Sequence, residues 1–145
     1  MNCFKIISLT HKLAPLELIG KLHLDENHQQ DYLGGLKIRM DLKELMFLST
    51  CNRVELVINT EREITSEYLS DLFYSINSRL TTEELSALIE KTITYEGDIA
   101  LTHLFEVSAS LDSLVVGERE IITQVRKAYE FCNLLGLTGD TIRLA

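Results

Sequence analysis

The stretch that decides the fold of this chain is Leu45-Met46-Phe47-Leu48-Ser49-Thr50-Cys51-Asn52-Arg53-Val54-Glu55-Leu56-Val57-Ile58. Two short apolar runs, 45–48 and 54–58, flank a polar cluster of five residues. Such runs predict buried β-strands, and the polar cluster predicts the turn between them. We expect strands at 44–51 and 54–60 that lie side by side and meet at an Asn52-Arg53 corner.

Strand and helix patterns continue on both sides of this stretch. An apolar run predicts a strand at 3–10, and Pro15 predicts the first turn of a short helix. A helix is expected at 24–40, with a break at Gly34-Gly35, and a short strand at 92–95.

The remaining segments predict helices. One is expected at 66–80, and the next, at 81–90, begins with a capping box in which Thr81 is the N-cap and Glu84 follows three residues later. Asp98 is expected to cap a helix at 98–114. The last helix, 118–135, carries an apolar stripe made of Ile121, Val125, Ala128, Cys132 and Leu135.

The predicted order is therefore β-α-β-β-α-β followed by two helices. This order is typical of the α+β class, in particular of a ferredoxin-like split βαβ sheet with helices on one face. The two C-terminal helices are additions to that sheet.

Length and composition limit the number of domains and the class of protein. At 145 residues the chain is expected to form one domain, and its 46% hydrophobic and 25% charged residues are ordinary for a globular protein. No apolar stretch approaches the roughly 18 residues of a membrane span. The segment 140–145 shows no signal for a chain end, so we expect a piece of a longer protein.

Charge and cysteine content narrow the class of protein. Asp and Glu outnumber Lys and Arg by 22 to 14, so this domain is not expected to supply most of the affinity for a nucleic acid. The three cysteines, Cys3, Cys51 and Cys132, have the spacing of neither a disulfide framework nor a metal site. A reduced, cytoplasmic protein without metal is the expectation.

Cys51 is the leading candidate for chemistry. Its thiol is the strongest potential nucleophile of the polar cluster, and the nearby Arg53 favours the thiolate. Arg53 is also suited to binding a carboxylate, while Thr50 and Asn52 are suited to orienting an amino or carbonyl group. The alternative, a cysteine that only fills space, stays open, because free cysteine is often buried.

Two other places carry polar candidates. His103 lies at the flank of a predicted apolar helix face, either as a hydrogen-bonded boundary residue or as a partner of Cys51. The segment 112–118 is a further polar corner, where Ser113, Glu118 and Gln124 are suited to binding a polar substrate. Glu120 shares a helix face with Gln124.

Several cofactor motifs are absent from the sequence. The seven glycines form neither a G-x-G-x-x-G fingerprint nor a Walker loop, and no H-E-x-x-H or zinc-type Cys/His spacing occurs. A redox cofactor is therefore expected to bind outside this chain.

The chain resembles the N-terminal catalytic domain of glutamyl-tRNA reductases. The resemblance depends on the segment 48–56 around Cys51, and on shorter matches in family order nearly from end to end. These matches are Ser8-Leu9-Thr10-His11-Lys12-Leu13-Ala14-Pro15, His103-Leu104-Phe105-Glu106-Val107, Leu111-Asp112-Ser113, Val116-Gly117-Glu118, Ile121 and Gln124-Val125-Arg126.

This resemblance implies an enzyme that reduces glutamyl-tRNA to glutamate-1-semialdehyde at the entry to tetrapyrrole biosynthesis. Cys51 would attack the glutamyl ester to form a thioester, which NADPH, bound by a domain absent from this chain, would reduce. The resemblance also implies a homodimeric full-length protein and handover of the product to the downstream aminomutase. It implies that His103 determines activity and that a glutamate pocket is lined by Thr50, Asn52, Arg53, Ser113, Glu118, Arg119, Glu120 and Gln124.

The chain departs from the family pattern at a few positions. Ser110 stands where the family often has glycine, and Arg119 and Glu120 stand where it commonly has proline and glutamine. The arginine-acid pair expected after Pro15 is replaced around Leu18-Ile19-Gly20. Two other functions stay open at this point: a non-catalytic α+β binding module with a structural Cys51, and an unrelated acyltransferase that uses Cys51 and His103.

Overall fold

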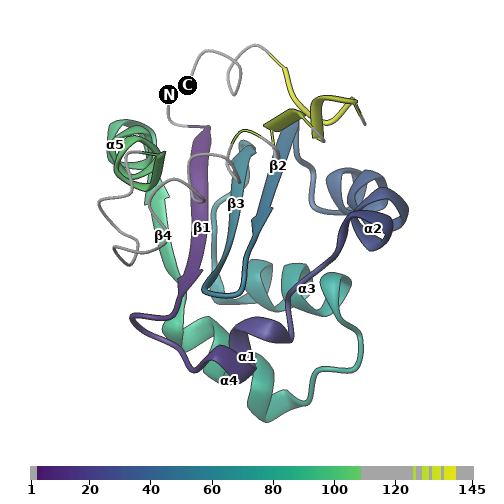
Figure 1. Ribbon diagram of the computed structural model, residues 1–145, viewed down its shortest axis with the longest axis vertical. Coiled ribbons are helices and arrows are strands. Elements are labelled where there is room, and N and C mark those ends of the chain that lie inside the picture. The colour runs from purple at the N-terminus through teal and green to yellow at the C-terminus, as the bar shows by residue number, and fades with distance from the viewer. Residues whose placement is uncertain (1–2, 109–125, 127–128, 131, 135, 140–145) are drawn as a thin grey trace.

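The computed structural model has a four-stranded sheet at its centre, in the order β2-β3-β1-β4 (Figure 1). The strands are β1 (Phe4–Thr10), β2 (Glu44–Ser49), β3 (Arg53–Asn59) and β4 (Ile93–Glu96), and each neighbouring pair is antiparallel. The structure describes residues 3–108, 126, 129–130, 132–134 and 136–139. A mixed helix-and-strand fold is confirmed.

The predicted pairing of the strands on either side of the Cys51 loop, β2 and β3, is confirmed, but their ends differ from the prediction. β2 ends at Ser49 and β3 begins at Arg53, with Ser49 opposite Val54. The Thr50 N–H donates to the Arg53 carbonyl oxygen over 2.8 Å and closes the hairpin. Cys51 and Asn52 therefore form the tip of the loop, and Arg53 belongs to the strand instead of the corner.

Two helices lie in each of the longer connections. The first connection contains α1 (Leu16–Gly20) and α2 (Glu26–Arg39), and the second contains α3 (Ser66–Ile76) and α4 (Thr82–Lys91). Figure 1 shows α2 on the β2 side of the sheet and α5 (Gly97–Ser108) on the β4 side. Among the described residues, no helix combines the length and apolar character needed to cross a membrane.

Two predicted helix features are wrong. α2 continues through Gly34-Gly35 without a break, because Leu33 and Leu36 on either side are both buried against the core while the two glycines face solvent. α3 ends at Ile76 instead of 80, because Asn77 adopts an extended conformation and its amide donates to the Lys21 carbonyl oxygen.

The predicted capping box is confirmed. The Glu84 N–H donates to the Thr81 hydroxyl oxygen over 3.1 Å, and the Thr81 N–H donates to the Glu84 carboxylate over 2.9 Å. The first residue of α5 is Gly97 instead of the residue after Asp98, and its φ of 59° is readily adopted only by glycine. The predicted helical residues 109–114 and most of 118–135 lie outside the described residues.

The core has two layers of side chains, one on each face of the sheet. On one face, Ile6, Met46 and Val57 lie against Leu104 and Val107 of α5. The strand residues on the opposite face of the sheet are also buried. They belong to the same core cluster as buried residues of α2 and α3 (Leu33, Leu36, Leu69, Leu72 and Phe73). α5 thus covers the face of β3 that carries Arg53 and Glu55.

Candidate active site

The Cys51 loop is a tight hairpin tip whose backbone is held by hydrogen bonds on both sides of the thiol. The Asn52 N–H donates to the Thr50 hydroxyl oxygen over 3.2 Å, and the Asn52 carbonyl oxygen accepts from the His11 N–H over 2.9 Å. Thr50 is buried, Asn52 is half-buried and Cys51 is exposed. The loop therefore presents the thiol to solvent on an anchored backbone.

The three cysteines differ in environment. Cys51 is exposed, Cys3 is half-buried and Cys132 is fully buried. Burial raises the pKa of the Cys132 thiol, which disfavours its thiolate. Of the three, Cys51 is thus the cysteine whose thiol is accessible from solvent.

A buried polar cluster begins two residues after the thiol. The Arg53 guanidinium donates to one oxygen of the Glu55 carboxylate over 2.7 Å, and the His103 Nε2 is hydrogen-bonded to the other oxygen. All three residues are at most 5% exposed. Tyr95 stacks on the His103 ring, with centroids 4.0 Å apart and planes inclined by 13°.

These contacts fix the ionisation of Glu55. Burial on its own would raise its pKa, but the hydrogen bond from His103 and the charges of His103 and Arg53 outweigh it and lower the pKa below its usual value. Glu55 is therefore held as a carboxylate. The His103 ring and the Arg53 guanidinium are in turn held in place by the two oxygens of the Glu55 carboxylate.

Glu55 is a site residue that the sequence analysis missed. Its signal is present in the sequence, because an acidic residue interrupts the apolar run 54–58 on a strand buried on both faces. A buried carboxylate requires partners. Its partner His103 lies 48 positions away, so no local spacing indicates the pair.

A small cavity opens next to this cluster on the same face of the sheet. It has a volume of about 180 Å³ and is lined by Ser8, Thr10, Lys12, Leu13, Ile93 and Tyr95. Ser8 lies opposite Glu55 and Thr10 lies opposite Arg53 in the β1–β3 register. The cavity therefore extends from the buried cluster toward the end of the sheet that carries the Cys51 loop.

The predicted site residues are brought together only in part. Thr50, Cys51, Asn52 and Arg53 share one hairpin, while His103 reaches the site through Glu55 rather than through a described contact with Cys51. The other predicted residues, Ser113, Glu118, Arg119, Glu120 and Gln124, lie outside the described residues.

Among the described residues there is neither a glycine-rich phosphate loop nor a cluster of metal-binding side chains. The strand-to-helix connections after β1 and β3 contain no glycine, and α5 follows directly on β4 with Gly97 as its first residue, so none of these places forms a glycine-rich phosphate loop. Within the described part of the chain, no three His, Cys, Asp or Glu side chains converge to hold a metal ion.

Sequence and structure comparisons point to one family. The family described as "Glutamyl-tRNAGlu reductase, N-terminal domain" matches residues 7–145. The glutamyl-tRNA reductase of Chlorobium luteolum is 38% identical over 137 residues, and that of Corynebacterium aurimucosum is 34% identical over 137 residues; each alignment covers 94% of this chain.

A solved structure shares the fold. The glutamyl-tRNA reductase from Methanopyrus kandleri matches with a TM-score of 0.71 and 28% identity, over 99% of this chain and 31% of that one. The chain likewise spans only 31% and 29% of the two curated relatives.

Proposed function

Because this chain belongs to the family of glutamyl-tRNA reductase N-terminal domains, we propose that it captures the glutamyl group of glutamyl-tRNA on Cys51. The observation that carries this proposal is the exposed thiol at an anchored hairpin tip, two residues from the buried Arg53–Glu55–His103 cluster. We further propose that the sheet is the ferredoxin-like split βαβ type, which the order β2-β3-β1-β4 supports.

The capture step is an acyl transfer. The Cys51 thiolate attacks the carbonyl carbon of the ester, the C–S bond forms, and the bond from that carbon to the ribose oxygen breaks. The ribose oxygen takes up a proton, and the products are an S-glutamyl enzyme and free tRNA. A thioester accepts hydride more readily than an oxygen ester, which suits it to the following reduction.

The substrate is positioned by the groups around the thiol. In the proposal, Thr50 and Asn52 orient the glutamyl group, and the adjoining 180 Å³ cavity accommodates its side chain. Arg53 supplies positive charge from its buried position on the same face of the sheet as the cavity. The Glu55 carboxylate holds both Arg53 and His103 in place. In the proposal, His103 influences the reaction indirectly. It is hydrogen-bonded to Glu55, and Glu55 positions Arg53 near the bound ester.

The remaining parts of the activity are assigned to the full-length protein. In this proposal another domain reduces the thioester to glutamate-1-semialdehyde with NADPH, because the sequence has neither a G-x-G-x-x-G fingerprint nor a Walker loop. Ser113, Glu118, Arg119, Glu120 and Gln124 complete the glutamate pocket in this proposal.

An acid-quenched single-turnover assay tests the capture step. The chain is mixed with tRNA carrying radiolabelled glutamate, and label bound to protein is counted after precipitation and removal of the RNA. We expect close to one label per chain for the wild type and none for Cys51→Ser. Cys132→Ser is the matched control, because Cys132 is buried and should leave labelling unchanged. Equal labelling of wild type and Cys51→Ser would contradict the proposal.

A further inference from the structure

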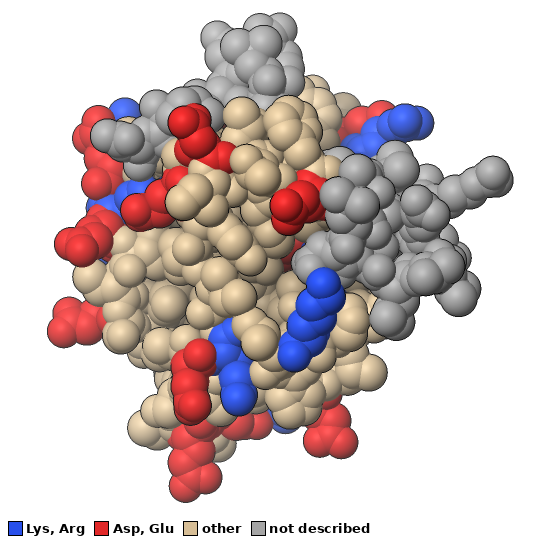
Figure 2. Space-filling model, turned by 90° about the vertical axis from the view of Figure 1, so that its left-hand side faces the viewer, with Lys and Arg blue, Asp and Glu red and all other residues tan. Residues whose placement is uncertain are grey.

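A polar groove lies between the α1–α2 connection and the C-terminal end of α3. Its volume is about 490 Å³, and its lining includes Lys21, His23, His28, Arg79 and Tyr32 but no Asp or Glu among the described residues. This composition is unusual for a chain with a formal charge of −8. On the side of the molecule that carries β4 and α5, acidic side chains and fewer basic ones border a largely uncharged surface (Figure 2).

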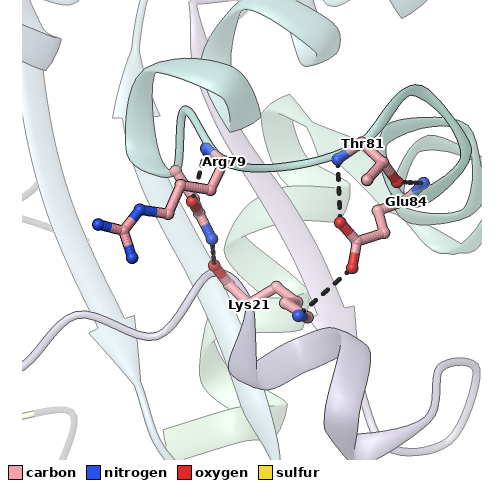
Figure 3. Close-up of polar contacts among 5 residues, drawn as sticks. Lys21, Arg79, Thr81 and Glu84 are labelled. Atoms are coloured by element: carbon pink, nitrogen blue, oxygen red, sulfur yellow. Dashed lines mark hydrogen bonds and ion pairs between the residues drawn. The ribbon is translucent and has the colours of Figure 1, made fainter.

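Two hydrogen bonds of Asn77 hold the groove together at its α3 end. The Asn77 side-chain amide donates to the Lys21 carbonyl oxygen over 2.9 Å, and its oxygen accepts from the Arg79 N–H over 3.0 Å. Figure 3 shows the Arg79 guanidinium pointing away from the Lys21–Glu84 ion pair, whose charged atoms are 3.4 Å apart. In the described part of the chain this guanidinium makes no hydrogen bond or ion pair, so its charge is available to a ligand.

An exposed pair of rings forms another part of the lining. Tyr32 is 50% exposed, and its ring lies parallel to that of His28, with centroids 6.2 Å apart. Asp25 holds His28 through a 2.8 Å contact between its carboxylate and Nδ1. A cationic groove with an exposed aromatic surface is the combination that proteins use to bind single-stranded nucleic acid.

The groove also adjoins the Cys51 loop. The His23 Nδ1 is hydrogen-bonded to the Ser49 hydroxyl over 2.6 Å, and Ser49 is two residues before Cys51. α1 lies at the end of the sheet where β2 turns into β3 (Figure 1). The part of the groove lined by His23 therefore lies close to the loop of the proposed nucleophile.

We propose that this groove binds the single-stranded 3′ end of the aminoacylated RNA, an inference that rests on the proposed function. Arg79 and Lys21 contact its phosphates, and a base stacks on the Tyr32–His28 pair. The geometry suits the chemistry, because the glutamyl ester is attached to the last nucleotide of that strand. The groove then guides the ester toward Cys51 on a domain that is acidic overall.

Fluorescence anisotropy with two RNAs tests this proposal. The probes are deacylated tRNA for glutamate and the same tRNA without its last three nucleotides. The wild-type chain is expected to bind the intact tRNA more tightly. Tyr32→Ala should weaken that binding about fivefold or more, as expected for a lost stacking contact. Arg79→Gln should weaken it and lower the slope of log affinity against log salt by about 1.

Arg39→Gln is the matched control. Arg39 is an exposed arginine at the opposite end of α2 from His28, so this variant removes one positive charge outside the groove. It should change neither the affinity nor the salt slope. The proposal is overturned if Arg79→Gln and Arg39→Gln behave alike, if the effect of Arg79→Gln persists on the truncated tRNA, or if the wild type binds neither RNA at low salt.

A second assay separates this inference from the proposed function. The wild type and Cys51→Ser are incubated with a small activated ester of glutamate that carries no RNA, and protein-bound glutamate is measured. Labelling of the wild type alone supports the proposed function whatever the groove does. An absence of labelling together with the expected effects of Tyr32→Ala and Arg79→Gln would contradict the capture step and leave the groove as an RNA site.

Discussion

The buried Arg53–Glu55–His103 cluster and the exposed groove around Lys21, His28 and Arg79 place similar residue types in opposite environments. In the cluster, one carboxylate holds both the Arg53 guanidinium and the His103 ring, and all three residues are at most 5% exposed. In the groove, Lys21 contacts Glu84 and His28 contacts Asp25, and neither acid lines the groove. Arg79 has no carboxylate partner among the described residues. Burial makes the cluster a rigid unit, whereas solvent leaves the groove free to exchange water for a ligand.

This difference predicts which substitutions affect folding and which affect binding. A buried charge that loses its partner has no water to replace it, so its loss is costly. An exposed charge is screened and its partners contribute little to stability. Substitutions in the buried cluster should therefore cost the most stability, and those at exposed positions the least.

Glu55→Ala should have the largest effect on stability. It leaves the Arg53 guanidinium buried without its carboxylate, so the free energy of unfolding should fall by about 3–5 kcal/mol in urea titrations. Glu61→Ala is the control, because Glu61 pairs with Lys43 on an exposed surface and should unfold like the wild type. Equal losses for both variants would remove the distinction between the two regions.

The pH dependence of stability should also depend on Glu55. Its pKa is lowered in the folded state, so its contribution is present above the ordinary value of 4.5 and is lost as the pH falls through the folded-state pKa. Urea midpoints measured between pH 7 and pH 3 should therefore fall less steeply for Glu55→Gln than for the wild type. Parallel curves would mean that Glu55 titrates normally.

His103→Phe should have a smaller effect. The ring and its stacking on Tyr95 are retained, but the Glu55 oxygen loses its hydrogen-bond partner. We expect a loss of about 1–3 kcal/mol in the free energy of unfolding, the usual cost of an unsatisfied buried acceptor. A variant as stable as the wild type would indicate that water reaches Glu55.

Thr81→Ala is expected to have the smallest effect of the series. It removes the hydroxyl that accepts from the Glu84 N–H at the start of α4, next to the groove. The loss of such a cap costs about 1 kcal/mol. Thr82→Ala is the control, since Thr82 lies within the first turn and is not the N-cap. A larger loss for Thr82→Ala would contradict the assigned cap.

The local features of the fold could be predicted from the sequence because their causes are local. The apolar runs around Cys51 predict two paired strands, and Thr81 with Glu84 predicts a helix start. The ends of elements depend on distant contacts. α3 stops where Asn77 reaches the Lys21 backbone, and α2 crosses two glycines because Leu33 and Leu36 hold it to the core.

The candidate site also divides into residues with a local sequence signal and residues that only distant contacts bring together. Cys51 could be proposed as the reactive position from the sequence, because it lies in a polar cluster between two strands, and in the structure its thiol is exposed. The partner of His103 could not, since Glu55 is 48 residues away and only the sheet and α5 bring the two together. The groove was missed because its residues come from the α1–α2 connection, α2 and the end of α3, and none of these segments is basic alone.

The most direct test of the central claim is to locate the glutamyl group on the protein. The chain is incubated with glutamyl-tRNA, quenched with acid and digested, and the peptides are sequenced by mass spectrometry. We predict one glutamyl adduct on the peptide that contains Cys51, released by hydroxylamine as a thioester and absent from Cys51→Ser. An adduct on Cys3 or Cys132, or an unmodified Cys51 peptide in the wild type, would contradict the account.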